Sequence, residues 1–308
     1  MKIQITGISG FVGSNLKEYL TNRNIDVTAL SMRSSNWISL IEDDADALVH
    51  LAGKAHDTIS SGSSEEYFAI NRDLTIELFK CFLKSNISDF FYFSSSKAVA
   101  DTVNGVLTEE IVGNPQTAYG KSKWEGEQYL LGQELPLGKR LFIIRPCMIH
   151  GPGNKGNLNL LYKVVLKGVP WPLANFVNKR SFLSIDNLCF LIEQMIYSKD
   201  VPSGIYNFAD DDSLSTNSLV ELIAKCVGKP KRLWHIPTTL IKMIVKVGDI
   251  LPLPLNSERL KKLTESYVVS NNKIKKVLRI QKLPTTSIDG LRKTIMSFTE
   301  RQESDLNT

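Results

Sequence analysis

The first two-thirds of the chain alternate short, almost wholly apolar runs with longer amphipathic stretches. Six runs have the character of buried strands: KIQIT (2–6), VTAL (27–30), ALVHLAG (47–53), FFYFSS (90–95), LFIIRP (141–146) and GIYNFA (204–209). Helical patterns lie between several of them, at 14–23, 75–85 and 118–131. Strands that are apolar on both faces and alternate with helices predict a parallel sheet covered by helices on both sides. Because crossovers between parallel strands are right-handed, the pattern predicts a doubly wound α/β fold.

The composition is that of an ordinary globular protein and argues against several classes. Of 308 residues, 43% are hydrophobic and 22% are charged, and the formal charge is only +5. Since Lys and Arg form no dense block, nucleic acid is not an expected partner. The most apolar stretch, LIKMIVKVGDILPLPL at 240–255, is interrupted by charges and prolines. It therefore predicts no membrane span, and an amphipathic helix packed on the protein's own core rather than on a membrane or a partner, so a membrane is not an expected partner.

The cysteines and histidines indicate neither disulfides nor a metal site. The cysteines lie far apart with no C-x-x-C pair, and the histidines have no ligand spacing; these residues are Cys81, Cys147, Cys189, Cys226, His50, His56, His150 and His235. Reduced, buried thiols are typical of a cytoplasmic protein. The chain also opens directly on a strand, so no signal peptide is expected.

A glycine-rich turn, ITGISGFVG at 5–13, joins the first strand to the first helix. Strand, glycines and helix in this order are the context of a dinucleotide site. One glycine permits a tight turn, another lets backbone N–H groups approach a diphosphate, and the last lets the helix pack on the strand. The diphosphate then lies at the helix N-terminus, where free N–H groups and the helix dipole favour negative charge. We therefore predict a dinucleotide-binding domain of Rossmann type over residues 1–150.

The chain changes in texture after this domain. The stretches 151–160 and 167–182 are rich in Gly, Pro and Asn. We expect 151–308 to form mainly a smaller, irregular C-terminal substrate-binding region, with 181–209 returning to the Rossmann-type domain. Within that domain, only 31–46 separate the second strand from the third, which is short for a crossover helix. The adenine side of the sheet is therefore predicted to be reduced.

Tyr119 and Lys123 lie four residues apart in AYGKSK, on one face of a predicted helix. A free phenol has a pKa of about 10 and exchanges protons poorly at neutral pH. A neighbouring ammonium group stabilises the phenolate and lowers that pKa, so the pair predicts general acid–base chemistry. A hydroxyl at the end of FYFSSS would hold a substrate oxygen against the phenol.

These motifs resemble the extended branch of the short-chain dehydrogenase/reductase superfamily, the NAD-dependent epimerase/dehydratase enzymes that act on nucleotide sugars. The segments that carry the resemblance follow in family order: G-x-x-G-x-x-G (7–13), HLAG (50–53), YFAINRDLTIELF (67–79), FYFSSSKAV (91–99), NPQTAYGKSK (114–123), RPCMIHGPG (145–153), RSFLSIDNL (180–188) and SIDGLRKTI (287–295). Among these enzymes, the chain most resembles bacterial polysaccharide-biosynthesis proteins, both UDP-hexose 4-epimerases and reductases of UDP-4-keto-6-deoxy-N-acetylhexosamines.

The resemblance implies a role for individual residues. Ser96, the third serine of its run, is implied as the catalytic serine, with Tyr119 as acid–base and Lys123 also binding the nicotinamide ribose. The cofactor-binding candidates are Gly7, Ser9, Gly10, Phe11, Val12, Gly13, Ser31, Arg33, Leu51, Ala52, Gly53, Lys54, Asn71, Ser94, Tyr119, Lys123 and Pro146. The substrate-binding candidates are Ser96, Met148, Asn157, Leu158, Trp171 and Arg180. His56, near Lys54, is a further candidate. The helices that carry Asn71 and Tyr119 resemble the family's dimer surface, which implies a homodimer.

The end of the second strand bears on the choice of dinucleotide. A carboxylate there would bind the ribose hydroxyls of NAD. The stretch LSMRSSN (30–36) has no acid but offers Ser31 and Arg33, and a guanidinium suits a 2′-phosphate. The sequence therefore favours NADP(H) and leaves NAD(H) open.

Hydride transfer at C4 of a UDP-sugar is compatible with more than one reaction. The related 4,6-dehydratases carry Asp-Glu after the serine, where this chain has Lys97 and Ala98, so dehydration is disfavoured. The Ser31/Arg33 strand end favours a 4-keto reductase of a UDP-6-deoxy-N-acetylhexosamine, and a UDP-hexose 4-epimerase acting on UDP-glucose or UDP-GlcNAc is the alternative. A non-catalytic NAD(P)-binding regulator is a third reading, but such proteins usually lose the tyrosine or the lysine.

Overall fold

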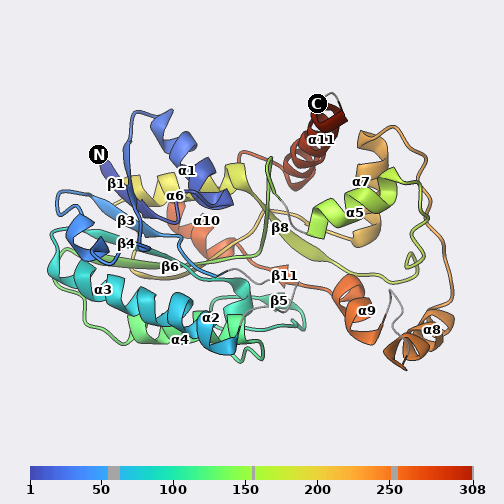
Figure 1. Ribbon diagram of the computed structural model, residues 1–308, viewed down its shortest axis with the longest axis horizontal. Helices are drawn as coiled ribbons and strands as arrows, with labels where there is room; N and C mark the ends of the chain where they lie inside the picture. The colour runs from blue at the N-terminus through green and yellow to red at the C-terminus, as the bar shows by residue number, and fades with distance from the viewer. Residues whose placement is uncertain (55–62, 155–156, 251–255, 307–308) are drawn as a thin grey trace.

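A computed structural model describes residues 1–54, 63–154, 157–250 and 256–306 (Figure 1). Its centre is a six-stranded sheet in the order β2-β1-β3-β4-β6-β9, in which every neighbouring pair is parallel. The strands are β1 (Lys2–Thr6), β2 (Asp26–Leu30), β3 (Ala47–His50), β4 (Asp89–Phe93), β6 (Arg140–Pro146) and β9 (Gly204–Phe208). The predicted doubly wound α/β fold is confirmed, and each predicted strand lies within a few residues of its expected position.

Helices cover both faces of this sheet (Figure 1). On one face lie α1 (Phe11–Thr21), α6 (Ile185–Tyr197) and α10 (Asn272–Leu278), and on the other lie α3 (Leu74–Lys84) and α4 (Ala118–Leu131). Alternate strand residues point to opposite faces. Phe91 and Phe142 therefore join the core beneath α1 and α6, whereas Phe90 and Ile143 join the core beneath α3.

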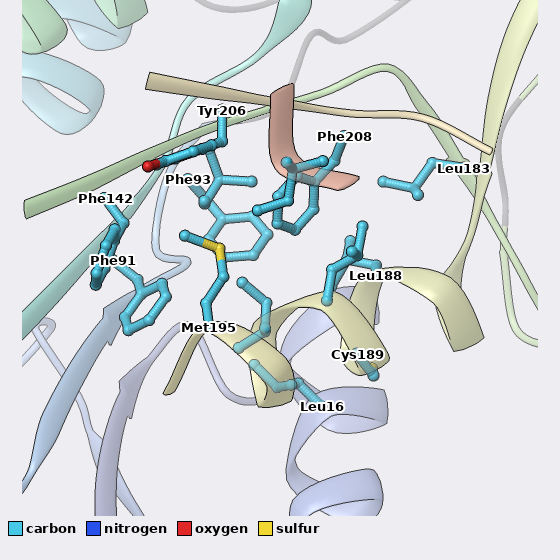
Figure 2. Packing of buried hydrophobic residues seen from close by; sticks show 14 of the residues in the cluster. Leu16, Phe91, Phe93, Phe142, Leu183, Leu188, Cys189, Met195, Tyr206 and Phe208 are labelled. Atoms are coloured by element: carbon cyan, nitrogen blue, oxygen red, sulfur yellow. The ribbon is translucent and has the colours of Figure 1, made fainter. Parts of the chain in front are cut away.

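Figure 2 shows the core on the α6 face, where aromatic side chains of the sheet pack on aliphatic side chains of α6. Phe93 and Phe208 lie close to Met195, and Leu188 packs beside them. Cys189 is buried in the same core. All four cysteines are described and all are free thiols; Cys147 and Cys189 are buried, as the sequence predicts, whereas Cys81 and Cys226 are only half-buried.

The sheet is reduced at the β2 edge, as the spacing predicts. Residues 31–46, all of which the structure describes, contain only the short 3₁₀ turn η1 (Trp37–Leu40) in place of a crossover helix. Trp37 is buried in the core between α3 and the sheet, together with Leu30 at the end of β2. The loop after β2 therefore leads straight back across β1 to β3.

A second, smaller unit follows β6. Its three-stranded sheet has the order β10-β8-β7 and packs with helices around a core of its own. The remaining elements are α2 (Ser64–Phe68), the π-helical turn η2 (Ala69–Asp73), the 3₁₀ turn η3 (Ser96–Ala98), β5 (Val106–Leu107), β7 (Met148–His150), α5 (Asn157–Leu166), β8 (Arg180–Ser184), β10 (Ser213–Leu214), α7 (Thr216–Cys226), α8 (Thr238–Ile250), α9 (Ser257–Thr264), β11 (Val268–Val269) and α11 (Ser287–Leu306).

Helix α8 corrects one expectation from the sequence. Ile241 and Val245 are buried in the core of the second unit, but Leu240, Met243 and Val247 are exposed. The helix thus packs along one edge only, because its apolar arc is wider than the face that the protein covers. Among the described residues, no helix is both long and apolar enough to cross a bilayer.

A buried ion pair joins α4 to the sheet. Arg145 of β6 donates from Nε to both carboxylate oxygens of Glu127, at 3.0 and 3.1 Å, and from Nη2 to Oε2 at 2.5 Å. Both side chains are almost fully buried. A pair of this kind costs desolvation to form, so removing one partner leaves an uncompensated charge in the interior.

We expect Glu127→Ala to lower the free energy of unfolding by about 3–5 kcal/mol. Glu125, on the solvent side of the same helix, forms a half-exposed pair with Arg72, so Glu125→Ala is the matched control and costs less than about 1 kcal/mol. The double variant Glu127→Leu/Arg145→Met recovers most of the loss, because it buries no unpaired charge. Urea denaturation followed by circular dichroism measures all three. Equal losses for the Glu125 and Glu127 variants would contradict this account.

Candidate active site

The glycine turn after β1 is as tight as its residues predict. Gly7 has a φ of +68°, a conformation that favours glycine, and its carbonyl accepts a hydrogen bond from the Gly10 N–H at 3.0 Å. A Cβ at Gly13 would lie 2.4 Å from the Gly7 carbonyl oxygen. The N-terminus of α1 is thereby brought against the end of β1.

The first turn of α1 can receive an anion. Among the described residues, no side chain caps this terminus, and its first turn holds no acidic residue. Ser9 and Gly10 are exposed there, so backbone N–H groups are open to solvent. The shape and polarity of the turn therefore fit the diphosphate of a dinucleotide.

A buried chain of hydrogen bonds supports the loop after β3. The Ala52 N–H donates to Thr6 Oγ1 at 3.0 Å, and Thr6 lies 2.7 Å from His50 Nδ1. His50 Nε2 lies 2.9 Å from Thr75 Oγ1, which donates to the Asn71 carbonyl at 2.9 Å. The Thr75 hydroxyl gives its proton to the Asn71 carbonyl, so it accepts from His50 Nε2. The Thr6 hydroxyl accepts from Ala52 and keeps its own proton for His50 Nδ1, so His50 carries its proton on Nε2. Burial, and then the nearby Lys123 charge, lower the pKa of His50 to about 3, so the ring is neutral.

Asn71 joins this loop to α4. Its Oδ1 accepts from the Lys54 N–H at 2.8 Å, and its Nδ2 donates to the Lys54 carbonyl and the Ser122 hydroxyl, both at 3.1 Å. Asn71 is fully buried in the π-helical turn η2. Its amide thus sets the distance between Gly53, at the cofactor side, and the helix that carries Tyr119.

Asp101 fixes the start of α4, a role that the sequence did not reveal. Its carboxylate accepts from the Gln116 N–H at 2.7 Å and from the Thr117 hydroxyl at 3.2 Å. Thr117 in turn caps α4 by accepting from the Gly120 N–H. Asp101 therefore supplies an anchor for the turn that presents Tyr119.

Lys123 extends from α4 into the carboxyl edge of the sheet. Its Nζ donates to the Phe93 carbonyl at 2.8 Å and lies 5.0 Å from the centre of the Tyr92 ring. A Cβ at Gly53 would lie 3.1 Å from the same Nζ. Burial lowers the pKa of Lys123 to about 8, although the Glu127 carboxylate raises it. The ammonium group is therefore held next to Gly53, in the loop after β3.

Tyr119 is half-buried, with its ring edge against Tyr67 at 6.2 Å between centroids. The sequence predicts a lowered pKa for this phenol, but in the structure its pKa is raised. Burial is the main cause, and a hydrogen bond with the Ser95 hydroxyl acts in the opposite direction. The Lys123 ammonium, directed at the Phe93 carbonyl, is not among the groups that lower it.

The serine in contact with the phenol is Ser95. Its hydroxyl also accepts from the Lys97 N–H at 3.1 Å and so caps η3. The catalytic assignment of Ser96 stays a prediction, and its backbone carbonyl accepts from the Tyr267 hydroxyl at 2.9 Å. The hydroxyl of Ser94, one of the cofactor-binding candidates, is buried with no hydrogen-bond partner among the described residues.

The other cofactor candidates lie around this edge. Ser31 and Arg33 are exposed in the turn after β2, and Pro146 ends β6. Leu51 and Ala52 are half-buried after β3. Lys54 pairs with Glu66, and its Nζ lies 5.2 Å from the centre of the Tyr67 ring. His56 lies outside the described residues.

Three of the substrate candidates belong to the second unit's core or pack against it. Leu158 and Trp171 are buried in the core of the second unit, and Met148 packs against it. The Trp171 indole N–H has no partner among the described residues. Asn157 begins α5, and its side chain lies outside the described part.

Arg180 is held by α9. Its Nη2 donates to the Lys262 carbonyl at 2.5 Å and its Nε to the Glu265 carbonyl at 3.3 Å. Burial lowers the pKa of this guanidinium, and the Glu265 carboxylate raises it. In the described part of the chain, no group of three or more His, Cys, Asp or Glu side chains could hold a metal ion.

The glycine cradle, the buried amine and the phenol occupy one edge of a doubly wound sheet, which is the design of a short-chain dehydrogenase/reductase. Comparison with known proteins gives the family within this class. The profile of the NAD dependent epimerase/dehydratase family matches residues 3–209, so the chain belongs to that family. The resemblance seen in the sequence is therefore confirmed, and the chain is a nucleotide-sugar enzyme of the short-chain dehydrogenase/reductase type.

Curated relatives include epimerases and a reductase. The chain is 28% identical to UDP-glucose 4-epimerase of Vibrio cholerae, covering 96% of this chain and 95% of the relative. It is 27% identical to N-acetyl-alpha-D-glucosaminyl-diphospho-ditrans,octacis-undecaprenol 4-epimerase of Escherichia coli O157:H7, covering 93% and 88%. It is 24% identical to GDP-6-deoxy-D-mannose reductase of Pseudomonas aeruginosa, covering 72% and 79%.

Solved structures share the fold. UDP-glucose 4-epimerase of Thermus thermophilus, in complex with NAD, has a TM-score of 0.74 at 19% identity, covering 97% of this chain and 99% of that one. RMD of Pseudomonas aeruginosa, in complex with NADPH, has a TM-score of 0.72 at 19% identity with the same coverage. One neighbour thus holds NAD and the other NADPH, on one fold.

The contact between Ser95 and the phenol can be tested by titration. We expect Ser95→Ala to raise the pKa of Tyr119, because the hydrogen bond that lowers it is lost, and Ser96→Ala to leave it unchanged. NMR of ring-labelled tyrosine measures the pKa, and Tyr119→Phe identifies the signal. If Ser96→Ala raises the pKa and Ser95→Ala does not, the phenol contact belongs to Ser96.

Proposed function

We propose that this protein is an NADPH-dependent reductase of the 4-keto group of a UDP-6-deoxy-N-acetylhexosamine, in surface-polysaccharide biosynthesis. The observation that carries the choice of reductase is the end of β2. Residues 31–36 offer Ser31 and Arg33 and no carboxylate, and Arg33 is exposed. A guanidinium there suits the 2′-phosphate that distinguishes NADPH, the dinucleotide that a reductase consumes and releases.

In this proposal each residue of the site has a separate role. When bound, the dinucleotide supplies the hydride for C4. Gly7, Gly10 and Gly13 would hold its diphosphate at the N-terminus of α1, and Lys123 its nicotinamide ribose. Tyr119 donates its phenolic proton to the oxygen on C4, since the raised pKa keeps that proton in place at neutral pH. Ser95 orients the phenol through its hydrogen bond, and Ser96 would hold the substrate oxygen.

The charge of Lys123 favours the direction of reduction. Once Tyr119 has given up its proton, a phenolate is left in a buried site, and the Lys123 ammonium would stabilise it by turning from the Phe93 carbonyl toward that oxygen. Lys123 lies one helical turn further along α4, on the same face. Because its pKa is about 8, most of the amine is charged at neutral pH.

A 4-epimerase is the second candidate, and the names of the relatives favour it. The two that cover most of the chain are a UDP-glucose 4-epimerase and a lipid-linked N-acetylglucosamine 4-epimerase. Lys97 and Ala98, in place of the dehydratases' Asp-Glu, argue against dehydration. The presence of both Tyr119 and Lys123 argues against a non-catalytic regulator.

Three further proposals accompany the function. The substrate is a UDP-sugar, with Arg180 and the Asn157–Leu158 pair at its diphosphate, Trp171 near the uracil, and Met148 in the sugar pocket. The protein is a homodimer through α3 and α4, which pack side by side on one face of the sheet. It works in the cytoplasm, where free thiols such as these stay reduced.

Two incubations separate the candidates. With UDP-4-keto-6-deoxy-GlcNAc and NADPH we expect loss of the reduced-nicotinamide absorbance near about 340 nm. With UDP-GlcNAc or UDP-glucose alone we expect no isomer. Arg33→Ala raises the KM for NADPH by roughly 10-fold or more and leaves that for NADH unchanged, because it removes a contact only the 2′-phosphate makes. Isomer formation without added dinucleotide would instead establish the epimerase.

The rate of reduction should depend on pH through Lys123. We expect kcat/KM to be constant near about pH 6–7 and to fall as the pH rises above about 8, because the ammonium is lost while the phenol keeps its proton. Glu127→Gln moves the fall to lower pH, since this carboxylate raises the pKa of Lys123. Glu125→Gln, on the solvent side of α4, is the control and leaves the profile unchanged. A profile that stays flat through about pH 9.5 would exclude this role.

A further inference from the structure

Helix α8 exposes an apolar stripe that nothing in the described chain covers. Leu240, Met243, Ile244 and Val247 have exposed fractions of 43%, 60%, 46% and 49%. Their spacing places them on one side of the helix. Buried Ile241 and Val245 hold the opposite edge against the second core. The stripe is therefore presented outward by a helix that is itself anchored.

Basic residues gather around this stripe. Residues 229–262 hold eight Lys and Arg but only two Asp and Glu, whereas the rest of the chain has 29 basic and 30 acidic residues. The excess positive charge of the protein thus lies in this one segment. The eight are Lys229, Lys231, Arg232, Lys242, Lys246, Arg259, Lys261 and Lys262, and all are exposed.

The lysines on α8 itself border the stripe. On the helix, Lys242 and Lys246 lie between the exposed apolar side chains and the groove that α8 forms with α9, which is also lined by Lys261. In the described part of the chain, none of these three amines pairs with a carboxylate. Their charges are therefore available to an anionic surface.

The position of α8 suits contact with an extended surface. In Figure 1 it lies at the right-hand end of the molecule, whereas β1, β3 and α3 lie toward the left-hand end. Trp234, in the loop that leads into α8, is also 56% exposed. Tryptophan is favoured at the boundary between water and lipid because its ring is apolar and its N–H is polar.

We propose that α8 binds the surface of a membrane that contains anionic phospholipids, lying in the plane of the interface with its apolar stripe among the acyl chains. An apolar stripe bordered by lysines is the pattern of an interfacial helix. The lysine stems lie along the apolar boundary while their ammonium groups reach the lipid phosphates. This contact is independent of the reaction at C4.

Flotation with vesicles tests the proposal on the full-length protein. We expect the protein to float with phosphatidylcholine vesicles that contain about 30 mol% phosphatidylglycerol, and to bind pure phosphatidylcholine at least about tenfold more weakly. Salt at about 0.5 M weakens binding to the anionic vesicles, because it screens the lysines. If the protein floats with neither kind of vesicle, the proposal is wrong.

Two variants separate the stripe from the charges. Met243→Ser/Ile244→Ser/Val247→Ser reduces vesicle binding at least about tenfold, since its apolar side chains no longer leave water. Lys242→Gln/Lys246→Gln reduces binding to anionic vesicles only. The matched controls, on the large domain and outside α3 and α4, are Leu137→Ser/Tyr197→Ser, whose side chains are 106% and 53% exposed, and Lys17→Gln/Lys199→Gln. Both controls bind vesicles like the wild type.

Sedimentation without vesicles tests the rival occupant, a second copy of the chain. We expect the triple α8 variant to keep the oligomeric state and the dinucleotide affinity of the wild type. A dimer that dissociates in this variant would overturn the proposal, because α8 would then be covered by its own partner. Unchanged vesicle binding by the triple variant would also overturn it.

Discussion

The polar contacts that hold α4 on the sheet are the constraint on which the site depends. Most helices of this size are held by an apolar stripe, but the buried residues of α4 are Gly120, Ser122, Lys123, Gly126, Glu127 and Leu130. Gly126 lets the helix come close, since a Cβ there would lie 2.9 Å from the Tyr92 hydroxyl. The Ser122 hydroxyl, the Lys123 amine and the Glu127 carboxylate then each bond to a different part of the sheet or its loops. Directional bonds fix the rotation of α4 more narrowly than apolar packing does, so Tyr119 and Lys123 face the carboxyl edge in one orientation.

This arrangement has an energetic cost that the function explains. Burying an amine lowers the pKa of Lys123 by making its charge expensive, and the Glu127 charge restores part of it. The protein keeps Glu127 in place with Arg145, so a buried pair one helical turn further along the same face of α4 supports the charge at the reacting edge. Perturbed groups of this kind concentrate where chemistry is done. His50 has the complementary place: a neutral ring at the base of the same loop adds no competing positive charge.

The sequence was a good guide wherever a local pattern decides the structure. Buried strands need continuous apolar residues and the glycine turn needs glycines, so both were predicted closely. Ser95 was missed because successive serines after a strand differ only in the rotation of the short turn η3, which tertiary contacts set. Asp101 was missed because its partners, Gln116 and Thr117, are distant in the chain. The pattern of α8 was recognised, but an amphipathic pattern does not tell which part of a wide apolar arc the protein itself covers.

The second unit is connected to the reacting edge by polar contacts as well as by the large core, which includes Leu183 of β8 and Tyr267. Arg180 donates to carbonyls at the end of α9, and the adjoining Tyr267 donates through its hydroxyl to the carbonyls of Ser96 and Ala100, each at 2.9 Å. Since a phenol has a single proton, it shares that proton between the two carbonyls. Tyr267 follows shortly after α9, and α9 packs on α8. The segment that holds the serine turn is therefore continuous with the helix that contacts α8. A change in the packing of α9 would reach the serine turn through one aromatic side chain. The second unit therefore helps to support the catalytic residues, although its strands β7, β8 and β10 form a sheet of their own.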